Sequence, residues 1–367
     1  MARRSTRAAT AIAAALVFGL TACGGDSGGG DTGSGGGGGG GDEAEGKVGV
    51  ILPDTKSSVR WESFDRPYLE AAFKDAGVDY DIQNAEGDAD RMTTIAEQMI
   101  TNGATVLAIV NLDSASGAQI QDAAAQEGVK TIDYDRLTLG GQAEAYVSFD
   151  NTEVGRLQGQ GLAQCLGDKD ANIAFLNGSP DDNNATLFAD GAHEVLDAMT
   201  NYKQVAEQAV PGWDNQQAAT IFEQMYTQAN GDIQGVLAAN DGLAGSVISI
   251  LEKNDQAGTV PVTGQDATVE GLQRILSGDQ CMTVYKSVRE EANALADLAV
   301  ALINGEDAGT NDTVTDSEGG RDVPAVLLKP QAIFRDNVKD VVDDDFVKAA
   351  DLCTGDFADA CSELGIS

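Results

Sequence analysis

The chain has 367 residues, with 23 Lys and Arg against 59 Asp and Glu and a single histidine. The formal net charge of −36 argues against nucleic-acid binding, which requires a basic surface. One histidine leaves almost no material for a Ser-His-Asp hydrolase or a multi-histidine metal site, so we expect neither a metal nor a cofactor. The length suits two domains of medium size, each with a buried core.

The first 22 residues have the pattern of an export signal. Three arginines precede an apolar run over 8–20, which is too short to remain as a membrane-spanning helix. The run ends in Leu20-Thr21-Ala22-Cys23, which resembles the lipobox of bacterial lipoproteins. We therefore expect a signal peptide over 1–22 and a lipid on Cys23 that anchors the protein to the outer face of the cell membrane. A plain secretory signal followed by an incidental cysteine is the alternative.

Residues 23–46 are predicted to be a linker. They are rich in glycine, with seven consecutive glycines at 35–41. A segment of this composition cannot bury enough apolar area to fold, so we expect a flexible connection between the lipidated cysteine and the rest of the chain.

From residue 47 to residue 149, short β-rich runs alternate with amphipathic helices. Strands are predicted at 47–52, 79–83, 105–110, 129–134 and 145–149, and helices at 62–76, 89–102 and 115–127. Each of these helices ends at a glycine, which favours the left-handed conformation of a helix terminus. The repeated order of helix, glycine and strand is typical of a parallel, doubly wound sheet.

The same pattern then starts again and indicates a second α/β unit. Strands are predicted at 172–176, 203–207, 235–238, 260–263 and 281–285, with helices near 186–199, 215–229, 242–253 and 268–277. A further helix at 291–304, late strands at 324–328 and 332–334, and a terminal helix over 343–352 complete the prediction.

Cysteine usage is consistent with an oxidising exterior. With Cys23 assigned to lipid, four cysteines remain, and four cysteines allow three pairings. The short spacing of Cys353 and Cys361 favours a local disulfide, which leaves Cys165 to pair with Cys281. There is no Cys-x₂-Cys spacing, so a structural zinc site is not expected.

Polar side chains follow the carboxyl ends of predicted strands in both units, where open parallel sheets bind ligands. They are Asn111, Asp135, Arg136, Asp150, Asn151, 177–184, Asn240, Asp241, Gln265, Asp266 and Lys286. Any one of them alone would be an ordinary turn or N-cap residue. Together they predict a site for a polar small molecule between two facing rims.

The residue types at these rims suit a sugar. The only tryptophans, Trp61 and Trp213, follow predicted strands in loop-like positions with polar neighbours. Flat aromatic rings cover the C–H faces of a pyranose, while charged and amide groups reach its hydroxyls. Three candidate cations (Arg60, Arg136, Lys286) balance three candidate carboxylates (Asp135, Asp241, Asp266). Such a neutral set matches an uncharged ligand.

Several motifs occur in a fixed order over residues 47–350. They are Val59-Arg60-Trp61, Tyr134-Asp135-Arg136, Ser148-Phe149-Asp150-Asn151, the segment 178–185 (GSPDDNNA), Asn240-Asp241, Gly264-Gln265-Asp266-Ala267, Met282-Thr283-Val284-Tyr285-Lys286 and Asp322-Val323-Pro324. In these motifs the chain resembles the D-xylose-binding members of the ribose and galactose/glucose family of periplasmic binding proteins, which serve bacterial ABC importers. The resemblance implies an α/β fold of two Rossmann-like lobes with parallel sheets, joined by a three-segment hinge (the type I periplasmic binding protein fold).

The resemblance also implies the lobe boundaries and the ligand contacts. The lobes would be 47–149 plus 287–324 and 150–286 plus 325–367, with crossings near 149–151, 284–287 and 324–327. The substrate contacts would be Arg60, Trp61, Asp135, Arg136, Asn183 or Asn184, Trp213, Asn240, Asp266 and Lys286. Trp61 and Trp213 would enclose the sugar ring from opposite lobes, and Asp241 would either contact the sugar or support Asn240.

The resemblance implies a monomeric, non-enzymatic receptor that delivers a monosaccharide, D-xylose first, to ABC permease subunits, with lipid as its only membrane contact. A receptor for another pentose or hexose is one alternative, because the first loop (53–56) departs from the family pattern. A receptor that serves a chemoreceptor is another, because the sequence does not separate that role from transport. A more remote alternative is a glycosidase with Asp135 and Asp266 as its carboxylate pair. The effector domain of a sugar-responsive repressor is disfavoured by the export signal.

Overall fold

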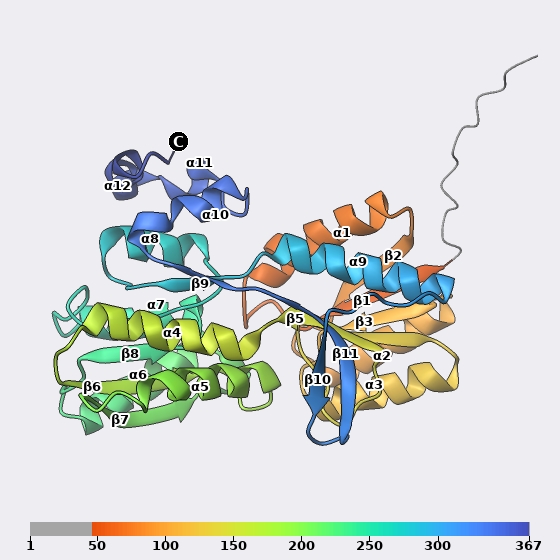
Figure 1. Cartoon of the computed structure of the whole chain (residues 1–367), viewed down its shortest axis with the longest axis horizontal. Helices are drawn as coiled ribbons and strands as arrows, with labels where there is room; N and C mark the ends of the chain where they lie inside the picture. Colours follow the sequence, from red (N-terminus) through yellow and green to blue (C-terminus); the bar gives the residue numbers. More distant parts are fainter. Residues whose placement is uncertain (1–45, 367) are drawn as a thin grey trace, which may run out of the picture. The chain divides into compact units, whose positions relative to one another are not determined.

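The computed structural model describes residues 46–366; the predicted signal peptide, Cys23 and the glycine-rich linker through residue 45 lie outside them. The first sheet has seven strands in the order β10-β11-β5-β4-β3-β1-β2 (Figure 1). Its strands are β1 (Lys47–Leu52), β2 (Asp79–Asn84), β3 (Val106–Ile109), β4 (Lys130–Tyr134), β5 (Ala145–Phe149), β10 (Asp312–Asp316) and β11 (Arg321–Leu328). All neighbours pair in parallel except β10, which is antiparallel to β11.

Helices cover both faces of the first sheet, as its buried strands require. They are η1 (Trp61–Asp65, a π-helical turn), α1 (Arg66–Asp75), α2 (Ala89–Thr101), α3 (Ser114–Gln126) and α9 (Val288–Asn304). Side chains alternate along a strand, so Val50 of β1 packs in the core with α1 and α9, whereas the adjacent Ile51 packs with α2 and α3.

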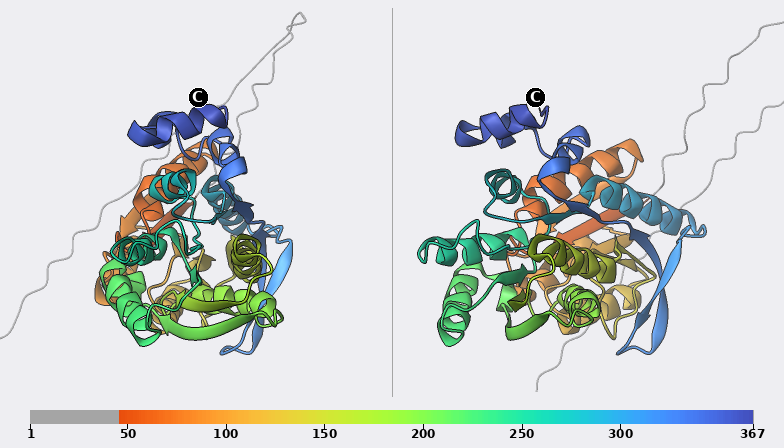
Figure 2. Two further views of the ribbon diagram at one scale, coloured as in Figure 1. Left: turned by 90° about the vertical axis from the view of Figure 1, so that its left-hand side faces the viewer. Right: turned by 60° about the vertical axis from the view of Figure 1, so that its left-hand side comes forward.

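The second sheet has three parallel strands in the order β7-β6-β8. Its elements are α4 (Asn151–Leu166), β6 (Ala171–Asn177), α5 (Asn183–Leu196), β7 (Tyr202–Ala209), η2 (Pro211–Trp213), α6 (Asn215–Gln228), β8 (Gly235–Ala238), α7 (Asp241–Glu252) and α8 (Val269–Ser277). The same alternation sends Leu176 of β6 toward α6 and α7, and Phe175 toward α4 and α5, which pack against each other (Figure 2).

One predicted strand of this second half is wrong, and another is confirmed only in part. The strand expected at 260–263 is reduced to a single bridge between Val236 and Val262, because Pro261 has no N–H to donate to a ladder. The strand expected at 281–285 is the shorter β9 (Thr283–Tyr285), which pairs only with β12 (Gln331–Ile333) in a separate antiparallel ribbon.

The chain passes between the two sheets three times. It leaves the first sheet after β5, returns between β9 and α9, and leaves again between β11 and β12. The third crossing, expected near 324–327, lies later, because β11 stays paired with β5 as far as Leu328 opposite Phe149. The predicted segment boundary between 324 and 325 therefore falls inside a strand.

After β12 the chain forms short helices: η3 (Arg335–Asn337), α10 (Lys339–Asp343), α11 (Ala349–Leu352), η4 (Gly355–Phe357) and α12 (Ala358–Glu363). The single terminal helix expected over 343–352 is wrong. Asp345 has a positive φ of 55°, which interrupts the helix, and Phe346 and Val347 turn into a core shared with α8. Within residues 46–366, no helix is both long and apolar enough to span a bilayer.

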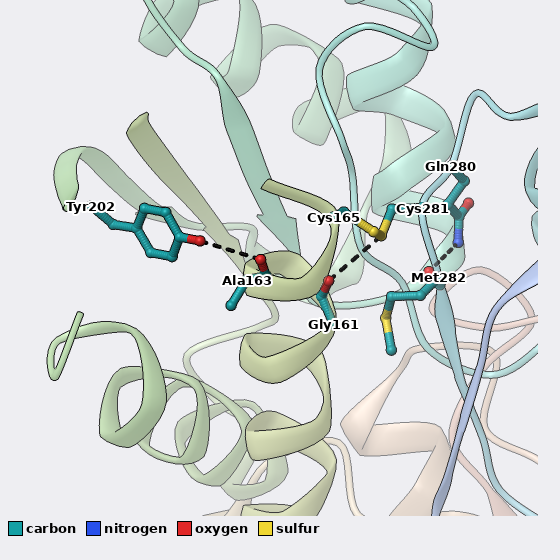
Figure 3. The surroundings of a disulfide bond; sticks show 7 residues. All are labelled: Gly161, Ala163, Cys165, Tyr202, Gln280, Cys281 and Met282. Atoms are coloured by element: carbon teal, nitrogen blue, oxygen red, sulfur yellow. Dashed lines mark hydrogen bonds between the residues drawn. A yellow bond between two sulfur atoms is a disulfide. The ribbon is translucent and has the colours of Figure 1, made fainter. Parts of the chain in front are cut away.

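Two disulfides brace the second half of the molecule. Cys165, near the end of α4, pairs with Cys281 just before β9 (Figure 3), and Cys353 pairs with Cys361 in α12. This is the pairing predicted from the spacing. The first bridge ties α4, which follows the first crossing, to the strand that precedes the second crossing.

Candidate functional site

A cavity lies between loops of the two sheets, and about 330 Å³ of space there, counted together with its opening to solvent, is free of protein atoms. Its first wall, from loops of the first sheet, is Ser57, Ser58, Arg60, Trp61, Asp135 and Arg136. Its second wall is Asp182, Asn184, Phe188, Trp213, Asn240, Gln265, Asp266 and Lys286. Every predicted contact lines the cavity except Asn183 and Asp241.

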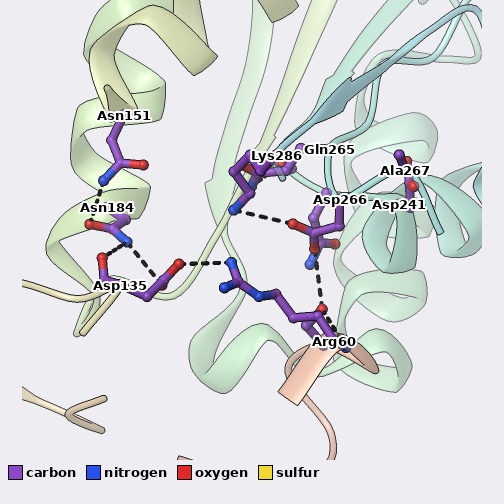
Figure 4. Close-up of polar contacts among 12 residues, drawn as sticks. Arg60, Asp135, Asn151, Asn184, Asp241, Gln265, Asp266, Ala267 and Lys286 are labelled. Atoms are coloured by element: carbon purple, nitrogen blue, oxygen red, sulfur yellow. Dashed lines mark hydrogen bonds and ion pairs between the residues drawn. The ribbon is translucent and has the colours of Figure 1, made fainter. Parts of the chain in front are cut away.

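Arg60, just before η1, is the ionic centre of the first wall. Its Nη1 donates to Asp135 Oδ2 at 2.8 Å (Figure 4). Its Nη2 donates to Asp65 Oδ1 at 2.8 Å and to Glu291 Oε2 at 2.6 Å. Its Nε also donates to Asp65, which makes a two-point pair. All four side chains are buried, and burial raises the pKa of Asp65 and of Glu291 despite the nearby guanidinium.

Asp135 follows β4 in a left-handed conformation with a φ of 62°. Non-glycine residues rarely adopt it, and here three hydrogen bonds hold the backbone. The Asp135 carbonyl accepts from Tyr146 Oη at 2.9 Å, from Ser148 Oγ at 2.8 Å and from Asn184 Nδ2 at 2.9 Å. The carboxylate is thereby fixed in the cavity.

The charge on Asp135 is also fixed. Burial alone would raise the pKa of Asp135, but the positive charges of Arg60, Lys286 and Arg136 outweigh burial and hold that pKa below its usual value. Asp135 therefore remains an ionised hydrogen-bond acceptor at neutral pH.

Both tryptophans are anchored through their indole N–H. Trp61, which begins η1, donates to Ser57 Oγ at 3.0 Å, and Trp213, which ends η2, donates to Asp182 Oδ2 at 3.1 Å. Gly178 permits the position of Trp213, since a Cβ there would lie 2.0 Å from the indole Cη2. The two rings belong to helical turns rather than to the loops predicted for them, and both are buried.

Lys286 belongs to the second crossing and reaches into the cavity between two aromatic rings. Its Nζ lies 5.7 Å from the ring centroid of Phe149 and 5.8 Å from that of Phe188, distances typical of cation–π contacts. The same ammonium lies 3.3 Å from Asp266 Oδ1 (Figure 4).

Direct polar contacts join the two walls around the cavity. Arg136 Nε lies 3.0 Å from Asp182 Oδ2, and Ser58 Oγ donates to Asp266 Oδ2 at 3.2 Å. A longer contact of 3.4 Å runs from the amide of Asn240 to the carbonyl of Ser57. The walls therefore close on each other, and a bound molecule would be surrounded by both.

Two predicted contacts lie outside the cavity. Asp241 is buried beneath the second wall, where its carboxylate accepts from Gln280 Nε2 at 2.7 Å, from Thr283 Oγ1 at 2.9 Å and from the backbone N–H of Thr268 at 2.9 Å. Asp241 thus fixes the turn that follows Asp266 instead of lining the cavity. Asn183 is half-buried at the start of α5, and its neighbour Asn184 faces the cavity.

The residues that line the cavity but were not predicted as contacts are Ser57, Ser58, Asp182, Phe188 and Gln265. Two of them could have been predicted from the sequence. Asp182 is the N-cap of α5, and Phe188 lies one helical turn after Asn184 on the same face. With Asp182 in place of Asp241, the cavity still has three cations and three carboxylates.

Known proteins share this architecture. The family described as a periplasmic binding protein domain matches residues 48–307. The D-xylose-binding periplasmic protein of Escherichia coli (strain K12) is 35% identical over 312 residues, which cover 84% of this chain and 93% of that protein. The multiple sugar-binding periplasmic receptor ChvE of Rhizobium radiobacter is 34% identical over 332 residues, which cover 84% of this chain and 92% of that protein.

A solved structure agrees with these relatives. An ABC transporter solute binding protein from Clostridium phytofermentans with bound β-D-glucose superposes with a TM-score of 0.77 at 28% identity, over 83% of this chain and 99% of that one. Its fold is the two-sheet arrangement predicted from the sequence. The chain therefore belongs to the periplasmic binding protein family, among the sugar-binding proteins of ABC transporters.

Proposed function

We propose that this protein captures a single monosaccharide, D-xylose in the first instance, between two closing lobes and delivers it to an ABC permease. The observation that carries the proposal is the composition of the cavity, in which two anchored tryptophans accompany three cations and three carboxylates. A sugar hydroxyl both donates and accepts, so it uses both signs of charge. An anionic ligand would favour surplus cation instead.

The choice of D-xylose is supported by the D-xylose-binding relative, which is aligned over most of both chains. The multiple sugar-binding receptor and the glucose-bound structure make another pentose or a hexose the second candidate. The small volume of the cavity favours one sugar ring over an oligosaccharide.

Binding without turnover is part of the proposal. A glycosidase needs a carboxylic acid that holds its proton near neutral pH. Asp135 does not meet this need, because its pKa is lowered by three cations. Burial raises the pKa of Asp182, but this carboxylate is already occupied by Arg136, Trp213 and the start of α5.

We further propose that lipid on Cys23 holds the receptor at the outer face of the membrane, next to its permease. The tetrapeptide Leu20-Thr21-Ala22-Cys23 supports this, and it lies outside the described residues. The glycine-rich linker would then let the binding domain reach the transporter.

Titration of the purified protein with sugars, followed by tryptophan fluorescence and calorimetry, tests the proposal. We expect saturation by D-xylose at micromolar concentration, about −8 kcal/mol of binding free energy, and weaker responses to ribose, arabinose, glucose and galactose. Saturation by another sugar alone would replace xylose and keep the receptor. If no sugar gives either heat or a fluorescence change, the proposal is overturned. Release of product from an aryl xyloside would favour the enzyme.

A further inference from the structure

The segment after β12 packs against the second crossing, and it lies beyond residues 48–307, where the family matches. This segment, 335–366, is braced by the disulfide between Cys353 and Cys361 and shares an apolar core with α8. Asp344 follows α10 and lies at the contact with the crossing.

Asp344 holds the outward-facing residues of the crossing. The hydroxyl of Tyr285 donates to Asp344 Oδ2, and the hydroxyl of Ser287 lies 3.4 Å from the same oxygen. The guanidinium of Arg289 donates to the Asp344 backbone carbonyl. Phe346, two residues after Asp344, has its ring centroid 5.0 Å from the ring centroid of Tyr285.

The residue between these contacts belongs to the cavity. Side chains alternate in extended chain, so Lys286 points away from the side on which Tyr285 and Ser287 meet Asp344. Lys286 is 5% exposed, lies between the rings of Phe149 and Phe188, and reaches Asp266. The crossing is therefore held from outside by the C-terminal segment while its one inward side chain lines the site.

We infer that Asp344 is a positioning residue for ligand binding, which fixes the second crossing so that Lys286 is presented to the sugar. The inference rests on the proposed function, because Lys286 is a sugar contact only there. Phe346 also stacks on Phe64 of η1, with ring centroids 4.2 Å apart. This contact connects the C-terminal segment to the helical turn of the first wall. Loss of the Asp344 carboxylate would remove its contacts with Tyr285 and Ser287, on the side of the crossing that faces away from the cavity.

The first arm of the test measures sugar affinity by calorimetry in four variants and one control variant. Asp344→Ala should weaken binding about tenfold, the equivalent of one hydrogen bond to a charged group. Asp344→Asn keeps an accepting oxygen for both hydroxyls and should stay within about threefold of the parent protein. Tyr285→Phe should cost no more than Asp344→Ala, and the double variant should lose no more than Asp344→Ala alone, because the Tyr285 hydroxyl is one of the two that Asp344 accepts from. Asp343→Ala is the control, because Asp343 is the adjacent residue and its one ion-pair partner within residues 46–366 is the exposed Lys339.

The second arm needs no sugar. The ε-amino group of Lys286 is labelled with an amine reagent in the ligand-free protein, and its rate is read by mass spectrometry. Asp344→Ala should label several-fold faster than Asp343→Ala. Equal labelling in the two variants would overturn the inference, whether or not affinity falls. Faster labelling in a protein that binds none of the sugars would support Asp344 as the residue that positions Lys286 and would refute the proposed function.

Discussion

The two walls of the cavity are built on different principles. In the first wall, the guanidinium of Arg60 is already paired with three carboxylates of the protein itself. In the second wall, amides and two aromatic rings predominate, and Gln265 Oε1 has no hydrogen-bond partner among the described residues. The first wall is thus ordered before any ligand arrives, whereas the second keeps acceptor capacity for one. Preordered contacts lower the cost of binding, and unpaired ones supply its specificity.

This comparison predicts that a change in the first wall costs mainly stability. Arg60→Ala leaves three buried carboxylates without their shared cation, and we expect a loss of about 3–5 kcal/mol in the free energy of unfolding, measured by urea denaturation. Arg66→Ala is the control, because Arg66 makes a more exposed pair with Glu62 one helical turn away and should cost about 1 kcal/mol or less. Equal losses in the two variants would contradict the comparison.

A change in the second wall should cost mainly affinity. Trp213→Ala removes one of the two rings proposed to cover the sugar, and we expect affinity to fall about hundredfold, close to 3 kcal/mol. Circular dichroism should show an intact fold. Trp213→Phe keeps an aromatic face and should recover part of the loss. Unchanged affinity in Trp213→Ala would remove this residue from the site.

Asp266, in the second wall, and Asp241, beneath it, offer a sharper contrast. Asp266→Asn weakens a charged contact inside the cavity and should reduce affinity by about 1–3 kcal/mol in calorimetry. Asp241→Asn makes the same chemical change outside the cavity and should leave affinity within about twofold. A neutral Asp266→Asn would show that Asp266 is only a turn residue.

The smallest predicted effect is the dependence of stability on pH. Burial raises the pKa of Asp133, below the first wall, to about 7, and burial also raises the pKa of Asp241, below the second, to about 6. The folded protein therefore holds protons that the unfolded chain releases near pH 4, so stability falls as pH rises from about 4 to about 7.

Urea denaturation between pH 5 and pH 8 checks this sign. We expect stability to drop by about 1 kcal/mol or more over that interval. Asp133→Asn should flatten the slope up to about pH 7, and Asp241→Asn only below about pH 6. A rise of stability with pH would contradict the assignment of protons to buried carboxyls.

Local pattern was sufficient for most of the fold. The strands at 47–52, 145–149 and 235–238 lie where the apolar runs predicted them, because each run is buried on both faces. The edge strand β10 was not predicted, since half-exposed antiparallel edges carry few apolar residues. The strand at 260–263 was predicted in spite of Pro261, whose missing N–H proved decisive.

The type of site could be predicted from the sequence more easily than the individual residues that line it. A mixture of tryptophans, cations and carboxylates is visible in the sequence, but which neighbour of a pair faces inward depends on the rotation of its helix. Asn183 and Asn184 have the same side chain, and only the start of α5 at residue 183 turns Asn184 toward Asp135. Asp241 was predicted to line the cavity, but Asp182 lines it instead, because tertiary contacts rather than residue type decide which carboxylate is buried below the cavity.

The two disulfides have a consequence for how the chain is made. Each joins cysteines that are consecutive along the chain: Cys281 is the next cysteine after Cys165, and Cys361 is the next after Cys353. If Cys23 is acylated as proposed, a chain exported amino terminus first offers each thiol its native partner before any rival emerges. Oxidation in the order of emergence then yields the native pairing directly, and secretion of this receptor should not depend on an isomerase that reshuffles disulfides.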